Sequence, residues 1–398
     1  METPKLRVAV IGAGRWAVRS HIPGWQRDPR VEVVAIAEVN EEALAAAAEE
    51  FGIARAVTDY RELVNDPDID VIDVATGNAM HFEISMAAIA AGKHVLCEKP
   101  VNSDYLETRR AAALAAEKGV KTKLGFTFRF APAIQFAKHL IDTGYIGEPY
   151  MFNGYEQNSQ WLDPQTPLRQ VDLEASPDRI AVSSIEGYGA PIIDIMHWWV
   201  DAPMTSVVGT MRNFVPERMV RDTGKMQAMN IDDGDMWIAE FEKNRLASIQ
   251  SSYVTVGNYP GIEARIYGSE GAIIVRLVEE AGICQTIKVA KKDSVEFVEL
   301  EIPQEFFPEG GASSEPWPFL FYSNLVKDFA TEILSGDDFN QGNFDQGALV
   351  QETINAFEKS FRTRAWCDFP LAVEARDAAS DAATDADVQV EQPVGAGA

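Results

Sequence analysis

Residues 6–17 read LRVAVIGAGRWA, and this stretch decides the fold of the first part of the chain. Gly12 and Gly14 belong to a G-x-G-x-x-[G/A] motif that follows an apolar, strand-like run and opens a helical pattern. Glycine permits the tight turn and the close approach of the backbone to a pyrophosphate, which then lies at the N-terminus of the helix. The motif therefore predicts a dinucleotide-binding βαβ unit.

An acidic residue stands where such a unit binds the ribose of the adenosine. The run VEVVAIAE (31–38) predicts a second strand, and Glu38 ends it roughly 20 residues after the glycines. A carboxylate at this position accepts hydrogen bonds from the ribose hydroxyls and repels a 2′-phosphate. We therefore expect the cofactor to be NAD, in preference to NADP. Its predicted binding residues in this part of the chain are Gly12, Gly14, Arg15, Trp16 and Glu38.

Two regions with different patterns of predicted strands and helices follow one another along the chain. Strand-like and helix-like stretches alternate up to about residue 125, as in βαβ units with a parallel sheet. From about Tyr150 the strands become longer and alternate between apolar and polar residues, which favours a largely antiparallel sheet with one face covered. The predicted fold class is α/β: an NAD-binding Rossmann domain (1–125), then a C-terminal α+β domain with a large, mostly antiparallel open sheet (126–370) for substrate binding and oligomerisation. Residues 371–398 are small and acidic, which predicts a disordered tail.

The composition argues against several classes of partner. The chain has 61 acidic and 35 basic residues and a formal net charge of −26, which repels phosphate backbones and anionic lipid. Its 3 cysteines have no paired spacing, so the sequence suggests neither disulfides nor a metal site. We find no signal-peptide pattern and no apolar run of the ~18 residues that a membrane span needs. We expect a cytoplasmic protein that binds neither nucleic acid nor membrane.

A lysine follows the strand-like run HVLC (94–97), within the sequence Glu98-Lys99-Pro100. Ligands of open parallel sheets bind beyond the carboxyl ends of the strands, so we expect Lys99 where nicotinamide and substrate meet. A partly desolvated lysine can lose its proton near neutral pH. It can then take a hydroxyl proton as hydride leaves, or hold the substrate oxygen. A solvated lysine at a strand end is the alternative.

Several stretches of the sequence resemble the Gfo/Idh/MocA family of oxidoreductases, which includes glucose–fructose oxidoreductase and inositol dehydrogenase. They are VAVIGAGRWA, VVAIAEVN, DVIDVATGNAMHFEISMAAIAAGKHVLCEKP, GFTFRFAPAI, SVVGTMRNF through IYGSEGAI, and ALVQETINAFEKSF. The resemblance implies that Lys99 is the catalytic or orienting residue on the substrate side. It also implies that Thr76, Gly77, Asn78, His81, Glu98, Lys99 and Arg129 line the cofactor cleft, with Gly77 where the family commonly has proline.

The stretch EGYGAPIIDIMHWW (186–199) matches a place where the family commonly carries D-x-G-x-H-x-x-D. In one register Asp194 and His197 are the acid/base pair, with one residue lost between them. In the other, Gly189 and Asp194 match the motif, and Pro191 stands where the histidine would be. We favour the second register because it continues without gaps and Pro191 suits the first turn of a helix, so that His197 is equally consistent with a core residue. The catalytic candidates are Lys99, Asp194, His197 and Tyr188.

The irregular segment 158–185 offers a surface for a substrate. Trp161 presents a flat apolar area for a sugar ring, and Arg169 presents a charge for an acidic substituent. An exposed aromatic and a solvated arginine explain these two residues equally well. The substrate-binding candidates are Lys99, Trp161, Arg169, Tyr188 and Asp194.

Together, the motifs and the resemblance predict an NAD-dependent oxidoreductase that acts on a CH–OH group of a sugar, polyol or sugar derivative, with Lys99 at the reacting oxygen. Two alternatives stay open. In one, tightly held NAD is used transiently, so that a glycoside is cleaved or a sugar rearranged without net redox change. In the other, the protein senses sugar and NAD without turnover. The resemblance also implies a homodimer or homotetramer formed through the open sheet.

Overall fold

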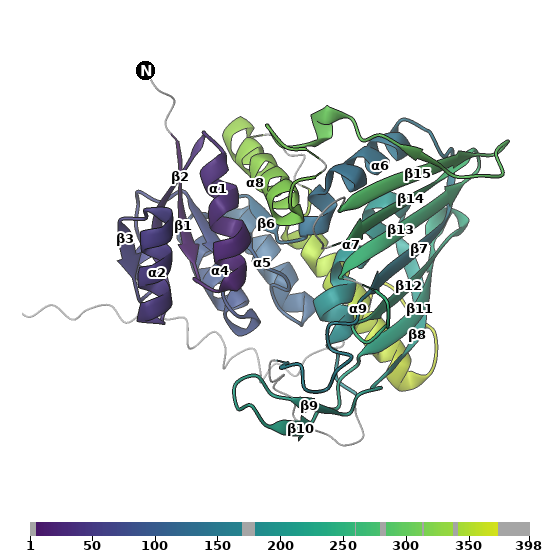
Figure 1. The fold of residues 1–398 in the computed structure, drawn as a ribbon, viewed down its shortest axis with the longest axis horizontal. Helices are drawn as coiled ribbons and strands as arrows, with labels where there is room; N and C mark the ends of the chain where they lie inside the picture. Colours follow the sequence, from purple (N-terminus) through teal and green to yellow (C-terminus); the bar gives the residue numbers. More distant parts are fainter. Residues whose placement is uncertain are drawn as a thin grey trace, which may run out of the picture.

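The computed structural model of the chain describes residues 5–168, 180–258, 260–278, 284–312, 314–336 and 341–372. Arg169 and residues 373–398 of the predicted tail lie outside these ranges. A six-stranded sheet and a nine-stranded sheet stand at opposite ends of the molecule, with helices between them (Figure 1). None of the described helices is long and apolar enough to cross a membrane.

The first sheet is parallel and has the strand order β3-β2-β1-β4-β5-β6. Its strands are β1 (Leu6–Ile11), β2 (Val31–Ala37), β3 (Arg55–Val57), β4 (Val71–Val74), β5 (His94–Cys97) and β6 (Thr122–Leu124). The strand order reverses between β1 and β4, and ligands of doubly wound sheets bind outside the carboxyl ends of the strands at this point. The sheet confirms the predicted Rossmann fold.

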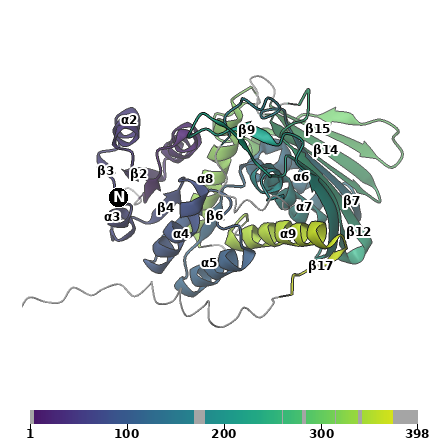
Figure 2. The ribbon, with the colours of Figure 1, turned by 90° about the horizontal axis from the view of Figure 1, so that it is seen from below.

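Helices pack on this sheet from both sides (Figure 2). They are α1 (Ile22–Arg27), α2 (Glu41–Phe51), α3 (Arg61–Val64), α4 (His81–Ala90) and α5 (Tyr105–Lys118), with the short turn η2 (Asn78–Met80). The helical pattern after the glycine motif is not one α-helix, because a π-helical turn, η1 (Ala17–His21), precedes α1. Pro23 in the first turn of α1 has no N–H to donate to the preceding turn, which accounts for this irregularity.

The second sheet has the order β16-β15-β14-β13-β7-β12-β11-β8-β17. Its strands are β7 (Pro149–Gln157), β8 (Met204–Arg212), β11 (Gly234–Phe241), β12 (Arg245–Ser252), β13 (Gly261–Gly268), β14 (Gly271–Val278), β15 (Gln285–Lys291), β16 (Val298–Leu300) and β17 (Cys367–Asp368). All neighbouring strands are antiparallel except β7 and β12, which are parallel. A separate hairpin pairs β9 (Glu217–Met219) with β10 (Met226–Ala228). The mostly antiparallel sheet is confirmed.

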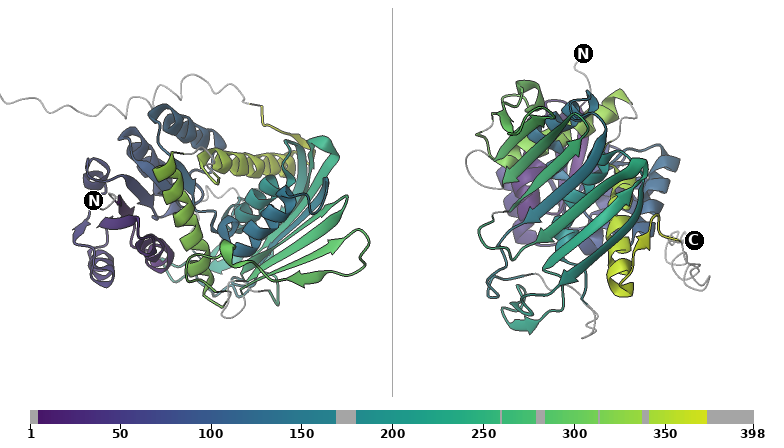
Figure 3. Two further views of the ribbon diagram at one scale, coloured as in Figure 1. Left: turned by 90° about the horizontal axis from the view of Figure 1, so that it is seen from above. Right: turned by 90° about the vertical axis from the view of Figure 1, so that its right-hand side faces the viewer.

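One face of the nine-stranded sheet is covered and the other is open. The covered face packs against α6 (Pro132–Asp142), α7 (Ala190–Val200) and α9 (Phe344–Thr363), with the turn η4 (Ile185–Gly189) leading into α7. Figure 3 shows the open face in its right panel, with no helix in front of it. Along β11, side chains alternate between buried and exposed, and Met236 and Ile238 point to the open side.

The last part of the chain returns to the Rossmann sheet. Helix α8 (Trp317–Ser335) packs against α1 and η1, and Figure 3 shows it between the two sheets in the left panel. Lys123 of β6 is completely buried and bonds to Asp328 Oδ2 at 2.8 Å and to Glu332 Oε1 at 2.7 Å, both on α8. Helix α8 therefore packs on the Rossmann unit as well as on residues 127–130, and the predicted division at residue 125 places it in the C-terminal domain.

Candidate active site

The glycine turn after β1 holds its backbone in a conformation that only glycine adopts readily. Gly12 has a φ of +109°, and a Cβ there would lie 2.6 Å from the carbonyl oxygen of Ala75. The next residue, Ala13, donates its N–H to Glu38 Oε2 at 2.8 Å, and Asn40 donates its N–H to Glu38 Oε1 at 3.0 Å. The turn and the Glu38 carboxylate are thus fixed relative to each other.

A cavity of about 220 Å³ opens beside this turn. It is lined by Ile11, Gly12, Ala37, Glu38, Val39, Thr58, Tyr60, Thr76, Gly77, Met80 and Ile84. Its walls are mostly apolar, which suits a purine base, and its carboxylate suits the two hydroxyls of a ribose. The residues present therefore fit the adenosine half of a dinucleotide, and Gly12, Glu38, Thr76 and Gly77 are brought together as the sequence predicts.

A second cavity, of about 330 Å³, lies beyond the carboxyl end of β5. We call it the central pocket; it is lined by Trp16, Glu98, Lys99, Gly125, Thr127, Phe128, Glu156, Gln160, Gly187, Tyr188, Pro191 and Trp317. Its lining therefore comes from the Rossmann sheet, from β7, from η4 and α7, and from α8. Such a cleft between domains, with a few polar groups among aromatic side chains, is typical of a small-molecule site.

Lys99 reaches across the central pocket to the second domain. Its Nζ donates a hydrogen bond to the carbonyl oxygen of Gly187 in η4. The neighbouring Tyr188 donates its hydroxyl to Gln160 Oε1 at 3.0 Å, so both polar groups on this side of the pocket are oriented. Pro191, where the favoured register places the missing histidine, lines the same pocket.

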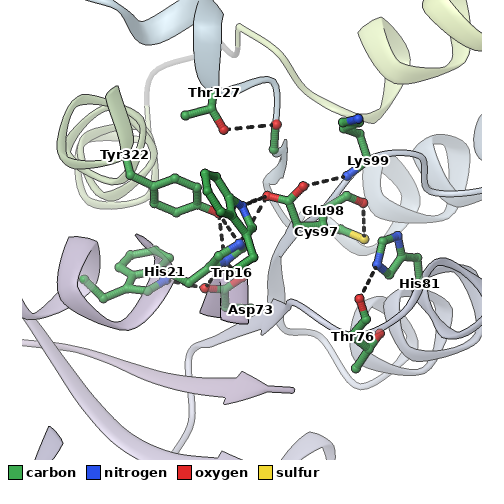
Figure 4. Close-up of polar contacts among 12 residues, drawn as sticks. Trp16, His21, Asp73, Thr76, His81, Cys97, Glu98, Lys99, Thr127 and Tyr322 are labelled. Carbon is green, nitrogen blue, oxygen red and sulfur yellow. Dashed lines mark hydrogen bonds and ion pairs between the residues drawn. The ribbon is translucent and has the colours of Figure 1, made fainter. Parts of the chain in front are cut away.

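Glu98 lies beside Lys99 and is anchored from the Rossmann side (Figure 4). Its Oε1 accepts hydrogen bonds from Trp16 Nε1 at 2.9 Å and from His21 Nε2 at 3.1 Å, and its Oε2 accepts from the Lys99 N–H at 3.3 Å. Burial alone would raise the pKa of Glu98, but the hydrogen bond and the charge of His21 outweigh it and lower that pKa. A Cβ at position 125 would clash with this carboxylate, so Gly125 provides its space.

Three of the remaining cofactor candidates lie at the starts of helical segments and outside the lining of the two cavities. His81 is buried and bridges two of the loops, with Nδ1 2.7 Å from the Pro100 carbonyl oxygen and Nε2 3.2 Å from the Thr76 carbonyl oxygen. Asn78 begins η2 and is exposed, and Arg15 is exposed after the glycine turn. His81 therefore joins the Thr76 loop to the Glu98-Lys99-Pro100 segment.

Arg129, Asp194 and His197 lie in the core rather than in the lining of the central pocket. Arg129 forms a bidentate pair with Asp194, with distances of 2.8 Å from Nε to Oδ2 and 2.6 Å from the guanidinium to Oδ1. His197 lies 2.8 Å from the hydroxyl of Thr353, and burial together with the charge of Arg129 lowers its pKa to about 3. The side chains of Asp194 and His197 are thus both engaged by the protein itself.

Trp161 stands just outside the central pocket. Its ring meets those of Tyr188 and Tyr253 edge-on, at centroid distances of 5.5 Å each. It supports Tyr188 from behind instead of facing the cavity. The remaining substrate candidate, Arg169, lies outside the described residues.

The structure brings to this cleft a group of residues that the sequence does not predict. They are Glu156, Gln160, Thr127, Phe128 and Trp317 in the pocket lining, and His21, Asp73 and Tyr322 behind Glu98. One signal was available: Asp73 interrupts the apolar strand VIDV (71–74), and a carboxylate in a fully buried strand requires a polar partner. Its partner, His21, is 52 positions away in the sequence, and nothing in the pattern identifies it.

Comparisons with known proteins agree with this geometry. Residues 6–126 match the oxidoreductase family with an NAD-binding Rossmann fold, and residues 134–274 match the Gfo/Idh/MocA C-terminal domain. The chain is 33% identical to 1,5-anhydro-D-fructose reductase of Ensifer adhaerens over 275 residues, covering 68% of this chain and 76% of that protein. It is 30% identical to levoglucosan dehydrogenase of Pseudarthrobacter phenanthrenivorans over 251 residues, covering 60% of this chain and 63% of that protein, just under two thirds of its length.

A solved structure extends the likeness over nearly the whole fold. Levoglucosan dehydrogenase in complex with NADH and levoglucosan superposes with a TM-score of 0.77 and 25% identity, covering 92% of this chain and all of that one. Residues 6–126 and 134–274 match the two family models, and the first of these regions is an NAD(P)-binding Rossmann domain. The chain therefore belongs to the Gfo/Idh/MocA family of oxidoreductases.

Proposed function

We propose that this protein is an NAD-dependent dehydrogenase that oxidises a CH–OH group of a neutral sugar or polyol. The observation that carries the proposal is the central pocket, which both Lys99 and Glu98 line at the carboxyl end of β5, with the Lys99 backbone N–H bonded to the Glu98 carboxylate. Ligands of a doubly wound sheet bind at this edge. When bound, NAD supplies an acceptor for the hydride that leaves the carbinol carbon.

The cofactor would be held by the residues around the glycine turn and the adjoining cleft. The Gly12 turn offers backbone to the pyrophosphate, and Glu38 accepts the ribose hydroxyls. A 2′-phosphate would meet the negative charge of Glu38, which supports the preference for NAD over NADP. Glu98 and Trp16, which both line the central pocket, border the end of the cleft near the substrate.

Lys99 is the proposed acid/base residue. One N–H of the Lys99 side chain is used by the hydrogen bond to the Gly187 carbonyl. The other positions around the nitrogen can contact a substrate oxygen. In the ammonium form it stabilises charge that develops on that oxygen, and in the amine form it accepts the hydroxyl proton. With Pro191 in the pocket and His197 in the core, Lys99 carries this role without the family's usual histidine.

The charges of the pocket lining support a neutral substrate. Among the lining residues, Glu98 and Glu156 are acidic and Lys99 is basic, so a carboxylate or phosphate on the substrate would meet a surplus of negative charge. Trp317 and Phe128 offer apolar ring faces, and Gln160 and Tyr188 offer hydrogen-bonding groups for hydroxyls. This combination fits a cyclic sugar, anhydrosugar or cyclitol better than a sugar acid.

The test mixes the full-length protein with NAD and a panel of substrates. The panel contains levoglucosan, 1,5-anhydro sugars, inositols, monosaccharides, linear polyols, sugar acids and glycosides. NADH absorbance and product mass are followed in the same samples. We expect NADH and a product two hydrogens lighter with a neutral cyclic substrate, and little turnover with the sugar acids.

Lys99→Met keeps the length of the side chain and removes the amine. We expect it to lower kcat/KM at least about 100-fold, as for loss of a general acid–base residue. Lys292→Met is the matched control, because Lys292 is exposed and pairs with Glu270 far from the pocket residues. Product formed without NADH would overturn the dehydrogenase in favour of a redox-neutral cleavage or rearrangement. NAD and sugar binding without any product would favour a sensor.

A further inference from the structure

Behind Glu98 lies a buried row of charged side chains that the proposed chemistry does not use directly. Both oxygens of Asp73 lie 2.9 Å from His21 Nδ1, and Glu98 Oε1 lies 3.1 Å from His21 Nε2 (Figure 4). His21 and Asp73 are completely buried, and the Glu98 side chain keeps 15% of its surface exposed, toward the pocket that it lines. We call Asp73, His21 and Glu98 the charge network.

The geometry favours a proton on both ring nitrogens of His21. Each ring nitrogen faces a carboxylate, and an ionised carboxylate oxygen can only accept a hydrogen bond. A neutral imidazole would turn a lone pair toward one of the two carboxylates, whereas the Tyr322 hydroxyl beside Nε2 can either donate or accept. Burial opposes a charged ring, but the charges and hydrogen bonds of Asp73 and Glu98 outweigh it and raise the pKa of His21 to about 9.

Tryptophans hold both ends of the network in place. Trp25 Nε1 donates to Asp73 Oδ2 at 2.7 Å, and Trp16 Nε1 donates to Glu98 Oε1 at 2.9 Å. An indole N–H donates but cannot accept, so both contacts favour the ionised carboxylates. The hydroxyl of Tyr322 on α8 lies 2.6 Å from His21 Nε2 and fixes the ring from the other side.

We propose that His21 is an imidazolium that acts as a positioning residue: it keeps the Glu98 carboxylate ionised and in one orientation beside Lys99, and so maintains a fixed negative charge at the substrate end of the cofactor cleft. Glu98 Oε1 is tied to the network, while Oε2 accepts the backbone N–H of Lys99 and so holds the segment that carries the amine. A fixed negative charge at this end favours the oxidised, cationic form of the nicotinamide ring over the reduced, neutral form.

The groups that bear on the titration of His21 come from three elements. They are Asp73 on β4, Cys97 and Glu98 with the adjoining Lys99 at the end of β5, and Tyr322 on α8. Burial raises the pKa of the Cys97 thiol and of the Tyr322 hydroxyl, so both stay neutral at physiological pH. The charge around His21 is therefore set by the Asp73 and Glu98 carboxylates, the imidazolium itself and Lys99.

The first test is nitrogen-15 NMR of the histidine rings in the wild-type protein without cofactor. The chain has 5 histidines, and His197, whose pKa burial and Arg129 lower to about 3, gives the reference signal of a neutral ring. We expect His21 to show two protonated nitrogens from about pH 6 up to about pH 9. A neutral His21 ring at about pH 7 would overturn the proposal.

The second test compares the binding of the two cofactor forms. His21→Gln keeps a polar side chain of similar size and removes the charge. We expect its Kd for NAD to rise at least about threefold more than its Kd for NADH, because only the oxidised ring interacts with the ionised Glu98 as a cation. His94→Gln is the matched control: it replaces a half-buried histidine of β5 in the same domain, but burial lowers the pKa of His94 and no charge is lost. An equal change for both cofactor forms in His21→Gln would contradict the proposal.

The third test uses the pH dependence of turnover, and it alone rests on the proposed dehydrogenase function. Without the charge of His21, burial raises the pKa of Glu98, so the variant should lose more activity than the wild type as the pH falls. We expect the ratio of kcat/KM at about pH 8.5 to that at about pH 6 to be at least about threefold larger in His21→Gln than in the wild type or His94→Gln. A purely structural role of His21 would lower activity equally at both pH values. Should no sugar react at all, the NMR and binding tests still decide the state of His21.

Discussion

Replacing Lys123 by methionine tests how α8 is attached to the Rossmann sheet. The Lys123 ammonium is fully buried and bonds to Asp328, Glu332 and the Gln341 carbonyl, at 2.8, 2.7 and 2.6 Å. Methionine fills similar space but leaves the buried Glu332 without its cation. Breaking a buried ion pair by removing one partner costs about 3–5 kcal/mol. For a chain of 398 residues, unfolding entropy of roughly 0.8 kcal/mol per kelvin converts this to a loss of about 4–6 °C in Tm.

The loss of stability in Lys123→Met should depend on pH. The protonation of Glu332 decides whether this loss grows or shrinks as the pH rises. Burial raises the pKa of Glu332, the neighbouring Asp328 adds to this, and Lys123 opposes it. Without Lys123 the pKa of Glu332 rises further, so the folded variant binds a proton that the unfolded chain releases above about pH 4.3. Stability that depends on this proton falls as the pH increases. Lys123→Met should therefore lose more stability at about pH 8.5 than at about pH 6.

Scanning calorimetry at the two pH values measures both effects. Lys292→Met is the surface control, since Lys292 and its partner Glu270 are both about half exposed and the change should cost about 1 kcal/mol or less. Adding Glu332→Leu to Lys123→Met removes both buried charges and should recover at least half of the lost stability. A fall in Tm of less than about 1 °C, or an equal fall at both pH values, would refute the reasoning.

Three further predictions follow from the glycine turn, the ribose site and the open sheet face. In Glu38→Ser the ratio of Kd for NADP to Kd for NAD should fall at least about tenfold, because the charge that repels a 2′-phosphate is gone; an unchanged ratio in binding titrations would exclude the ribose site. Gly12→Ala should abolish measurable NAD binding in calorimetric titrations and cost about 1–3 kcal/mol of stability, because of its φ of +109° and the contact with Ala75; normal binding would contradict the assigned turn. The wild type should sediment as a dimer or tetramer formed by the open face, and Ile238→Arg on that face should dissociate it, whereas a monomeric wild type would refute the assembly.

The local parts of the fold are those that the sequence predicts well. The first strand, the glycine turn and the acidic residue Glu38 can be predicted because a few neighbouring residues determine each of them. In β11 and β12, the alternation of buried and exposed residues indicates a sheet with one open face. The strands β16 and β17 and the hairpin β9–β10 are not predicted, because runs of 2 or 3 residues carry little periodic signal.

The site depends on contacts between distant segments, and here the sequence is less informative. The contact between Tyr322 and His21 joins residues 301 positions apart, and no local pattern records it. The stretch 186–199 allows two registers from its residues alone. In the structure, the residues that the two registers assign lie in different places. Pro191 lines the pocket, while Asp194 pairs with Arg129 and His197 with Thr353 in the core. Their catalytic roles, like that of Lys99, stay predictions until the variants are measured.

The return of α8 to the Rossmann sheet has a consequence for how this protein can be divided or recombined. A fragment that ends after β6 would lack the helix that contacts α1 and neutralises Lys123, and it would expose an apolar surface around Trp25. If cofactor domains were exchanged between relatives at a single point near residue 125, α8 would come from one protein and the Rossmann sheet from the other. The buried interface between them would then no longer match. The cofactor-binding unit is discontinuous in the sequence, because it consists of the first six strands together with residues 317–335. A functional chimera has to exchange both segments together.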